Sequence, residues 1–205
     1  MQPGDRLEVL VDGFVIDIVR GKTLIEIQTR NFSAIKRKLQ YLVEKYPVRL
    51  VYPISSEKWI IREGGLLEGG TRRRKSPRRA EVVDLFVELV RIPELIAHEN
   101  FSLEALLIRE EEMRRKDGRG SWRRKGWSIY DRRLLEVIDR QLFTAPSDFS
   151  ALLPVALPRS FTSADLAMAL GKPRYLAQKM AYCLRKMEAI TITGKEGNSL
   201  IYSRG

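Results

Sequence analysis

Two short turns near the start of the chain fix how three neighbouring strands must pair. Asp12-Gly13 separates the apolar stretch 6–11 from Phe14–Arg20, and Gly21-Lys22 separates Phe14–Arg20 from Thr23–Thr29. Two-residue connections of this composition are typical of tight β-hairpins, and they set which residues face each other across the strands. The sequence therefore predicts a three-stranded meander with a defined register over residues 6–29.

This register aligns three acidic side chains across the predicted meander. Counting back from each turn places Glu8 opposite Asp17, and Asp17 opposite Glu26. Because side chains alternate along a strand, Gln28 shares the face of Glu26. The isoleucines of the second and third strands are expected to point the other way, into a core: Ile16, Ile18, Ile25 and Ile27. Three acids and one amide therefore converge on one face.

Clustered carboxylates raise each other's pKa unless a cation neutralises them. A hard divalent cation such as Mg²⁺ or Mn²⁺ is the simplest neutralising group, because it accepts one or two carboxylates together with waters and substrate phosphates. The alternative is that the acids lie on a solvated face of the meander, each paired with a nearby Lys or Arg. The pattern leaves both interpretations open.

These residues resemble the motif of a nuclease superfamily. Asp17, eight intervening residues and then Glu26-Ile27-Gln28, followed by a helix and a crossover strand, resembles the PD-(D/E)XK superfamily. The Gln at the third motif position is similar to the variant seen in the competence protein CoiA group. The resemblance covers residues 5–62 and implies a restriction-endonuclease-like mixed sheet. It also implies that Asp17 and Glu26 hold a divalent metal, with Gln28 in the position of the usual Lys.

Two departures from the family pattern concern charge and the missing first helix. Gln28 cannot carry the positive charge of Lys, and related variants recruit a basic residue from the next helix. The helix predicted at 33–46 offers Lys36 and Lys38, which flank its apolar stripe, whereas Arg37 points away. Family members usually begin with a helix that supplies an acid, so Glu8 takes that role here or the chain is trimmed or degenerate.

The charge balance indicates a nucleic-acid partner. Lys and Arg number 37 against 26 Asp and Glu, a net charge of +11. Such an excess is typical of DNA-binding proteins, although association with ribosomes or anionic membranes also fits it. No apolar run is long enough to cross a bilayer and no signal peptide is evident, so we expect a cytoplasmic protein without a membrane partner.

Cysteine and histidine are too scarce for other common chemistries. The single Cys183 excludes an intrachain disulfide, and the single His98 leaves too few soft ligands for a zinc site. Cys183 is expected on the buried side of a helix and His98 in a loop. Cys–His nucleophilic catalysis is therefore disfavoured, which leaves acid-plus-metal chemistry.

The central part of the chain predicts a crossover strand, a basic linker and a mixed middle region. Residues 48–54 are expected to run parallel to the Glu26 strand, and 58–63 to form an edge strand, in a sheet of about five strands. The glycine- and arginine-rich stretch that follows is interpreted either as a flexible linker or as a clamp on phosphates, carried by Arg72, Arg73 and Arg74.

Residues 80–143 are expected to contain a helix at 80–97, a β-hairpin around the Asp117–Gly120 turn and a second helix at 131–143. Glu110, Glu111 and Glu112 are interpreted as a solvated surface paired with Arg. Trp122 and Trp127 either stack on bases or pack against the hairpin.

The last part of the chain resembles a winged helix-turn-helix fold over residues 150–204. Thr162 or Ser163 caps a short helix that ends at Gly171, and Pro173 begins a second helix, followed by a hairpin. Leu176, Met180, Leu184 and Met187 form the core stripe of the second helix. The opposite face carries Arg174, Lys179 and Arg185, and the hairpin tip carries Lys195, as expected of a DNA-reading surface. A winged helix used for protein contacts is the alternative.

These interpretations combine into an α/β (α+β) protein of three consecutive parts. They are a nuclease-like core at 1–70, a basic linker and middle region at 71–145, and a winged-helix domain at 146–205. The expected function is hydrolysis of phosphodiester bonds in DNA with Mg²⁺ or Mn²⁺. A DNA-binding regulator or scaffold that retains an inactive nuclease fold is the alternative, and a structural protein of a nucleoprotein assembly is a third reading. A second copy of the chain is a further candidate partner.

Overall fold

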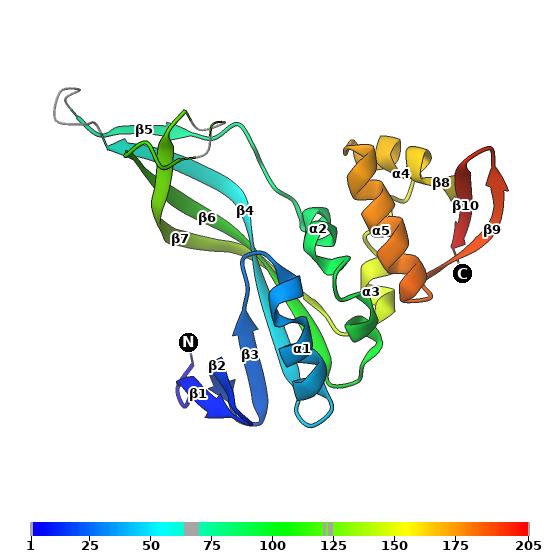
Figure 1. Cartoon of the computed structure of the whole chain (residues 1–205). Coiled ribbons are helices and arrows are strands. Elements are labelled where there is room, and N and C mark those ends of the chain that lie inside the picture. The colour runs from blue at the N-terminus through cyan, green and yellow to red at the C-terminus, as the bar shows by residue number, and fades with distance from the viewer. Residues whose placement is uncertain (1, 64–69, 121, 123–124, 205) are drawn as a thin grey trace. The chain divides into compact units, whose positions relative to one another are not determined.

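The computed structural model describes residues 2–63, 70–120, 122 and 125–204, and contains one large mixed sheet and one small sheet (Figure 1). The large sheet has the strand order β1-β2-β3-β4-β6-β7, and β5 pairs with β4. Its strands are β1 (Arg6–Val11), β2 (Phe14–Arg20), β3 (Thr23–Ile27), β4 (Val48–Glu63), β5 (Arg72–Lys75), β6 (Phe101–Lys116) and β7 (Trp127–Phe143). The mixed α/β class expected from the sequence is therefore confirmed.

Both predicted hairpin turns are confirmed. Val11 pairs with Phe14 across the first turn, and Arg20 pairs with Thr23 across the second. Gly13 and Gly21 both have positive φ, the backbone conformation that a two-residue turn requires and that glycine adopts without steric cost. The isoleucine prediction is confirmed only in part, because Ile16 and Ile25 are buried whereas Ile27 is 44% exposed.

The crossover after the meander is also confirmed. Helix α1 (Phe32–Val43) connects β3 to β4, and the two strands run parallel with Glu26 opposite Leu50 (Figure 1). The helix buries Phe32, Leu39, Leu42 and Val43. It is shorter than the stretch 33–46 predicted from the sequence, because residues 44 and 45 form a turn and Pro47 disfavours the helical conformation at Tyr46.

Two predictions for the strands that follow were wrong. The stretches 48–54 and 58–63 form one continuous strand, β4, which lies inside the sheet and not at its edge. Pro53 lies within this strand. The predicted helix at 131–143 is instead part of β7, a 17-residue strand next to β6. Its apolar residues recur at a helical spacing, but Leu134 and Ile138 are exposed, so they mark no buried helix face.

The helix predicted at 80–97 is broken into three short pieces: η1 (Val82–Leu85), α2 (Phe86–Leu89) and η2 (Pro93–Ala97). Pro93 begins the last of them, since its missing N–H costs nothing at the first position of a helix. Phe86 and Leu89 are buried, as the helical spacing predicted.

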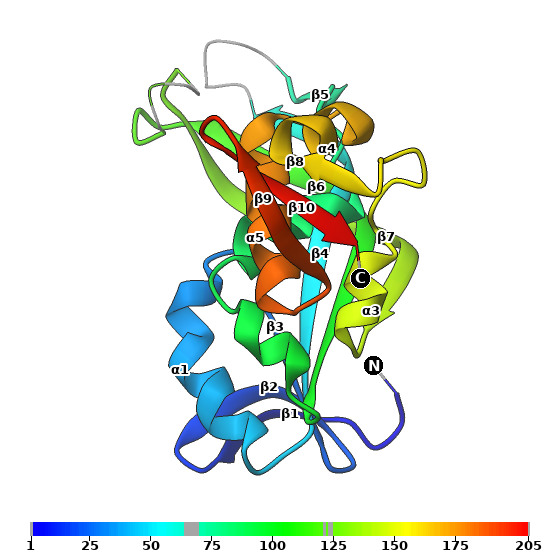
Figure 2. The same cartoon turned by 90° about the vertical axis from the view of Figure 1, so that its right-hand side faces the viewer.

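The C-terminal part contains α3 (Pro146–Ser150), β8 (Ser160–Thr162), α4 (Ser163–Leu170), α5 (Arg174–Lys186), β9 (Ile190–Glu196) and β10 (Ser199–Arg204). The three strands form a separate sheet in the order β8-β10-β9, with α5 packed beside it (Figure 2). The Thr162 side chain caps α4, and Gly171 ends it in the left-handed conformation. Leu176, Met180 and Leu184 are fully buried, which confirms the predicted stripe of α5.

Contacts divide the chain into two compact units, each drawn from separate stretches. Unit 1 comprises Met1–Tyr52, Val83–Ala105 and Gln141–Gly205, and unit 2 comprises Pro53–Val82 and Leu106–Arg140. This division cuts across the three consecutive parts predicted from the sequence, because β4, β6 and β7 each contribute to both units. None of the described helices is long and apolar enough to cross a membrane.

Candidate functional site

Glu26 lies on β3 under helix α1, where it is almost completely buried. It is 5% exposed, and its Oε1 forms an ion pair with the Lys38 ammonium at 2.6 Å. Lys38 also donates a hydrogen bond to the backbone oxygen of Val15 on β2, at 2.5 Å. The helix therefore delivers one cation to the acidic face of the meander.

Asp17 lies on the neighbouring strand, β2, and its carboxylate reaches toward β3. Its Oδ2 accepts a hydrogen bond from the backbone N–H of Ile27 at 2.7 Å. Since Ile18 pairs with Ile25, the continuing register places Asp17 opposite Glu26, as the two turns predicted. The structure thus brings together Asp17, Glu26 and Lys38.

The surroundings of Glu26 make its carboxyl group harder to ionise than that of a free glutamate. Burial raises the pKa of Glu26 above its ordinary value; Lys38 opposes this effect, and the negative charge of Asp17 adds to it. The ammonium of Lys38 pairs with Glu26 and not with Asp17, so one negative charge is left over when both carboxylates are ionised. An additional cation would lower the pKa of Glu26 and stabilise the pair.

Three other residues predicted for this site lie apart from it or remain at its margin. The β1–β2 register places Glu8 opposite Asp17, as the first turn predicted, because Leu7 pairs with Ile18 and Val9 with Ile16. Glu8 is nevertheless exposed and has positive φ, and among the described residues no three acidic, His or Cys side chains gather as a metal site. Lys36 is directed to η2, where its ammonium lies 4.0 Å from Glu94. Gln28 is half-buried, and its backbone N–H donates to Val51 O at 2.9 Å. Of the two lysines proposed on this helix, only Lys38 contacts Glu26.

The interpretation of the arginine-rich stretch as a flexible linker is wrong for Arg72–Lys75, which form strand β5, whereas the alternative of a clamp on phosphates stays a prediction. β5 pairs with β4, and its alternate side chains contact unit 2: Arg73 pairs with Glu111 at 2.9 Å, and Lys75 pairs with Glu57 at 3.1 Å. Both also lie over the ring of Trp59. All four residues of β5 are exposed, and among them no ion pair is seen for Arg72 or Arg74 in the described part of the chain. Residues 64–69 lie outside the described part of the chain.

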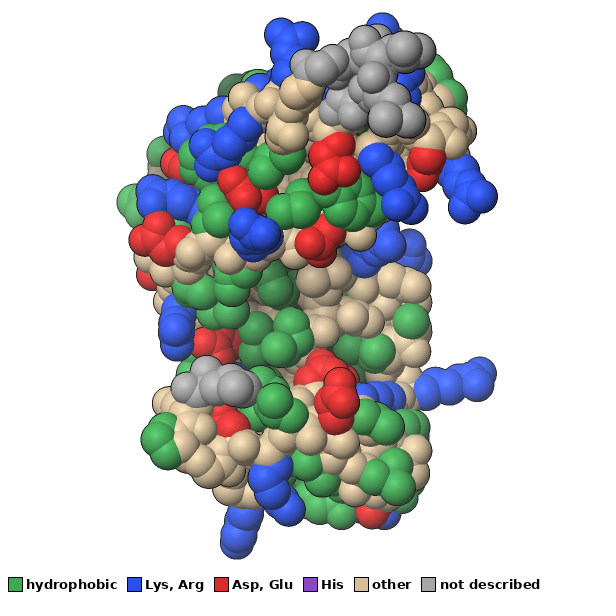
Figure 3. All heavy atoms as spheres, turned by 90° about the vertical axis from the view of Figure 1, so that its left-hand side faces the viewer, with side chains coloured by type: hydrophobic (Ala, Val, Ile, Leu, Met, Phe, Trp, Pro, Cys, Tyr) green, Lys and Arg blue, Asp and Glu red, His purple; other side chains and the backbone are tan. Residues whose placement is uncertain are grey.

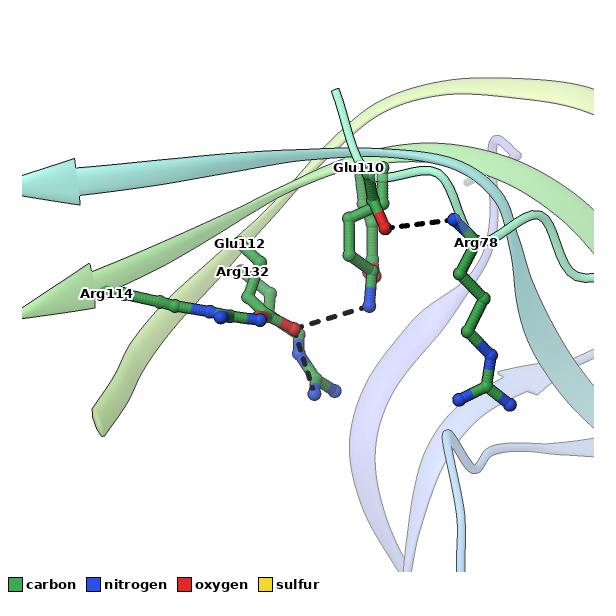
Figure 4. A network of polar contacts seen from close by, with 7 residues as sticks. Arg78, Glu110, Glu112, Arg114 and Arg132 are labelled. Atoms are coloured by element: carbon green, nitrogen blue, oxygen red, sulfur yellow. Dashed lines mark hydrogen bonds and ion pairs between the residues drawn. The ribbon is translucent and has the colours of Figure 1, made fainter. Parts of the chain in front are cut away.

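The second acidic cluster is a buried network in unit 2, and the prediction that it is solvated was wrong. Glu112 is 2% exposed and pairs with Arg114 at 2.5 Å and Lys58 at 3.3 Å, with Arg132 at 3.6 Å (Figure 4). Burial would raise the pKa of Glu112, but Arg114 and Lys58 together lower it. Lys58 also pairs with Glu110 at 2.8 Å, and Arg73 pairs with Glu111, so each acid has a basic partner and the cluster is a structural element.

The basic face predicted on α5 is present, with one change. Arg174, Tyr175, Tyr182 and Lys186 are exposed, and the Arg185 guanidinium lies 5.7 Å from the centre of the Tyr182 ring. Lys179 instead turns toward α2 and donates to Val87 O at 3.1 Å. Lys195 is exposed on β9, and Trp122 is 83% exposed. Arg123 and Arg124, which the sequence places between the tryptophans, lie outside the described residues.

Basic side chains are scattered over the face of the molecule that Figure 3 draws. On the face drawn in Figure 3, Lys and Arg side chains alternate with acidic and apolar ones and do not form one continuous patch. Sequence reasoning missed Arg30 and Arg91, which line a cavity together with Lys179. No signal in the sequence connects them, because about sixty residues separate the two arginines and only the packing of α1, α2 and α5 brings them together.

Comparison with known proteins identifies a family and one relative. A family model described as "Domain of unknown function (DUF8091)" matches residues 1–144. An uncharacterized protein of Treponema pallidum (strain Nichols) is 31% identical over 204 residues, covering 98% of this chain and 79% of the relative. No solved structure matches the chain.

Proposed function

The chain belongs to the DUF8091 family, and we propose that it is a metal-dependent nuclease that hydrolyses phosphodiester bonds in DNA. The observation that carries this proposal is the group formed by Asp17, Glu26 and Lys38, in which the two carboxylates come from paired neighbouring strands and Glu26 forms an ion pair with Lys38 of the following helix. We also assign β1 to β4 with α1 to a restriction-endonuclease-like core, and α3 to β10 to a winged helix. The order of elements in each part supports these assignments.

The residues of the site fit a divalent cation. Asp17 and Glu26 are hard oxygen ligands, and Mg²⁺ typically needs only one or two carboxylates, with waters and substrate phosphates completing its shell. The cation would lower the pKa of a bound water and stabilise charge on the phosphate. Lys38 would compensate negative charge beside Glu26, taking over a task that neutral Gln28 cannot perform. The Gln28 amide would form a hydrogen bond with the attacking water.

The direct test is cleavage of labelled DNA by the purified chain. We expect products from linear, nicked or single-stranded substrates with Mg²⁺ or Mn²⁺, and none in EDTA. If no substrate is cut with any metal, the nuclease proposal fails.

A second candidate function is a DNA-binding scaffold that retains an inactive nuclease fold. The burial of Glu26 favours this candidate, because a carboxylate that is 5% exposed and already paired with Lys38 is poorly accessible to a metal ion. The two candidates predict the same DNA binding and differ only in hydrolysis, so the cleavage assay separates them.

DNA binding through α5 should show in the salt dependence of the affinity. Replacing both Arg174 and Lys186 with Glu should weaken binding and reduce the slope of log affinity against log salt by about one unit for each DNA phosphate that the helix no longer neutralises. Both side chains are exposed, so folding should be unchanged. Fluorescence anisotropy over a salt series measures the slope.

A matched control for this experiment is the double variant Arg133→Glu, Arg140→Glu, at two exposed arginines on β7. It changes the net charge by the same amount, so an equal loss with this variant would mean that only the overall charge matters. An unchanged slope in the α5 variant would assign this helix to protein contacts.

A further inference from the structure

A cavity within unit 1 is lined mainly by cationic and polar side chains. Its volume is about 280 Å³, and it lies where the start of α1 meets α2 and α5. The lining includes Arg30, Asn31, Ser33, Glu88, Arg91 and Lys179. Three of these are cations and one is an acid, so the cavity carries an excess of positive charge.

The basic groups of the cavity have donors to spare. Arg30 and Arg91 are exposed, and neither forms an ion pair with an acid among the described residues. The Lys179 ammonium donates one hydrogen bond to Val87 O at 3.1 Å, and its other two N–H bonds remain able to donate to a ligand. The arginine guanidinium is planar and presents paired N–H groups that match phosphate oxygens. These donors therefore suit an oxyanion.

Glu88, the one acid that lines the cavity, already accepts a hydrogen bond from the protein backbone. The Glu88 carboxylate accepts a hydrogen bond from the backbone N–H of Phe32, the first residue of α1, at 3.1 Å. The first turn of α1 contains no acid of its own. The Glu88 carboxylate offsets the partial positive charge at this end of the helix, so the excess positive charge of the cavity comes from its three cationic side chains. Ser33, in the same turn, contributes a hydroxyl group to the lining.

We propose that this cavity binds a phosphate group, either free or carried as a monoester. The volume is near the lower limit for small-molecule pockets, which suits one phosphate group with an attached sugar better than a larger cofactor. The phosphate would lie between the two arginines, and Lys179 would donate to it from α5. The proposal does not depend on hydrolysis at Asp17, and it explains why Lys179 turns away from the exposed face of its helix.

The same phosphate chemistry has three sources: inorganic phosphate, a nucleoside monophosphate, or the 5′-phosphate at the end of a DNA strand. Isothermal titration calorimetry of the full chain with each probe, at one fixed salt concentration, distinguishes them. The strand-end source requires a 5′-phosphorylated oligonucleotide to bind more tightly than its 5′-hydroxyl counterpart, and the Arg91→Gln variant to remove this difference. The other two sources require saturable binding of the small probe.

Variants of the cavity test the proposal directly. Arg91→Gln and Lys179→Met should each weaken phosphate binding by about tenfold or more, the typical effect of losing one charge-assisted hydrogen bond. Arg37→Gln, an exposed arginine on the same helix as Ser33, is the control and should leave the affinity unchanged. Because Arg91 is exposed, its variant should fold even if Lys179→Met does not. The proposal is overturned if no probe binds, or if Arg91→Gln and Arg37→Gln have equal affinity.

Discussion

Replacing Asp17 with Asn should reduce metal-dependent cleavage of DNA by at least roughly 100-fold, because the site loses a charged ligand. Asn is a better replacement than Ala, because it removes the charge with less disturbance of the local structure. The Asp17 side chain accepts a hydrogen bond from Ile27 N at 2.7 Å, and the amide oxygen of Asn can keep this contact while the charge is removed. DNA binding should change little, since the exposed basic residues of α5 are untouched. Single-turnover cleavage and anisotropy measure the two quantities.

The control for this variant is Glu8→Gln. Glu8 is exposed, and the structure does not gather it with Asp17 and Glu26, so cleavage should remain within about twofold of the original rate. Undiminished cutting by Asp17→Asn would place the hydrolytic centre elsewhere. Gln28→Lys is an informative companion, because it restores the charge that is usual at this position of the motif.

Replacing Lys38 with Met should destabilise the protein by about 3 kcal/mol at neutral pH, since breaking a buried ion pair leaves an uncompensated charge. The side chains of Glu26 and Lys38 are only 7% and 17% exposed, so solvent screens the pair weakly. Urea unfolding of both proteins between pH 4 and pH 8 measures the loss. The free energy of unfolding of a small protein typically falls by about 1–3 kcal/mol per molar urea, which converts the shift of the midpoint into an energy.

The pH dependence of this loss follows from the direction of the Glu26 shift. The folded state raises the pKa of Glu26 above its ordinary 4.5. Its contribution to stability is therefore fully present below the unfolded pKa, and is lost as the pH rises through the folded pKa. Removing Lys38 raises the folded pKa further, so the deficit of Lys38→Met should shrink toward pH 4 and be largest at neutral pH.

Two variants make this prediction specific. Adding Glu26→Gln to Lys38→Met removes the buried charge and should recover most of the lost stability at pH 7. Lys36→Met is the matched control: its ammonium is 4.0 Å from Glu94 and more exposed, so its loss should be within about 0.5 kcal/mol. Equal effects of the two lysine variants at every pH would show that Glu26 is not the charge that Lys38 compensates.

The sequence alone predicts those parts of the fold that short turns and helix caps determine. Each two-residue turn constrains a register by itself, so the pairing of Asp17 with Glu26 could be obtained by counting. Capping by Thr162 and termination at Gly171 are equally local. These signals need no knowledge of the rest of the chain.

The errors arose where distant segments decide the structure. Residues 131–143 carry apolar side chains at a helical spacing, yet pairing with β6 makes them a strand, and the apolar spacing alone could not reveal that partner. Likewise, both Lys36 and Lys38 flank the apolar stripe of α1. Only the way α1 lies over β3 distinguishes the lysine that contacts Glu26 from the one that approaches Glu94.

The small sheet has a consequence for how the protein is made. β10 follows β8 and β9 in the chain, yet it lies between them and forms all the strand pairs of this sheet. During synthesis, β8 and β9 therefore have no strand to pair with in this sheet until β10 has left the ribosome. Helices α4 and α5 can form earlier, but the sheet beside them completes only afterwards. A chain that stops before Ser199 would expose two unpaired strands, and would be a target for aggregation and proteolysis.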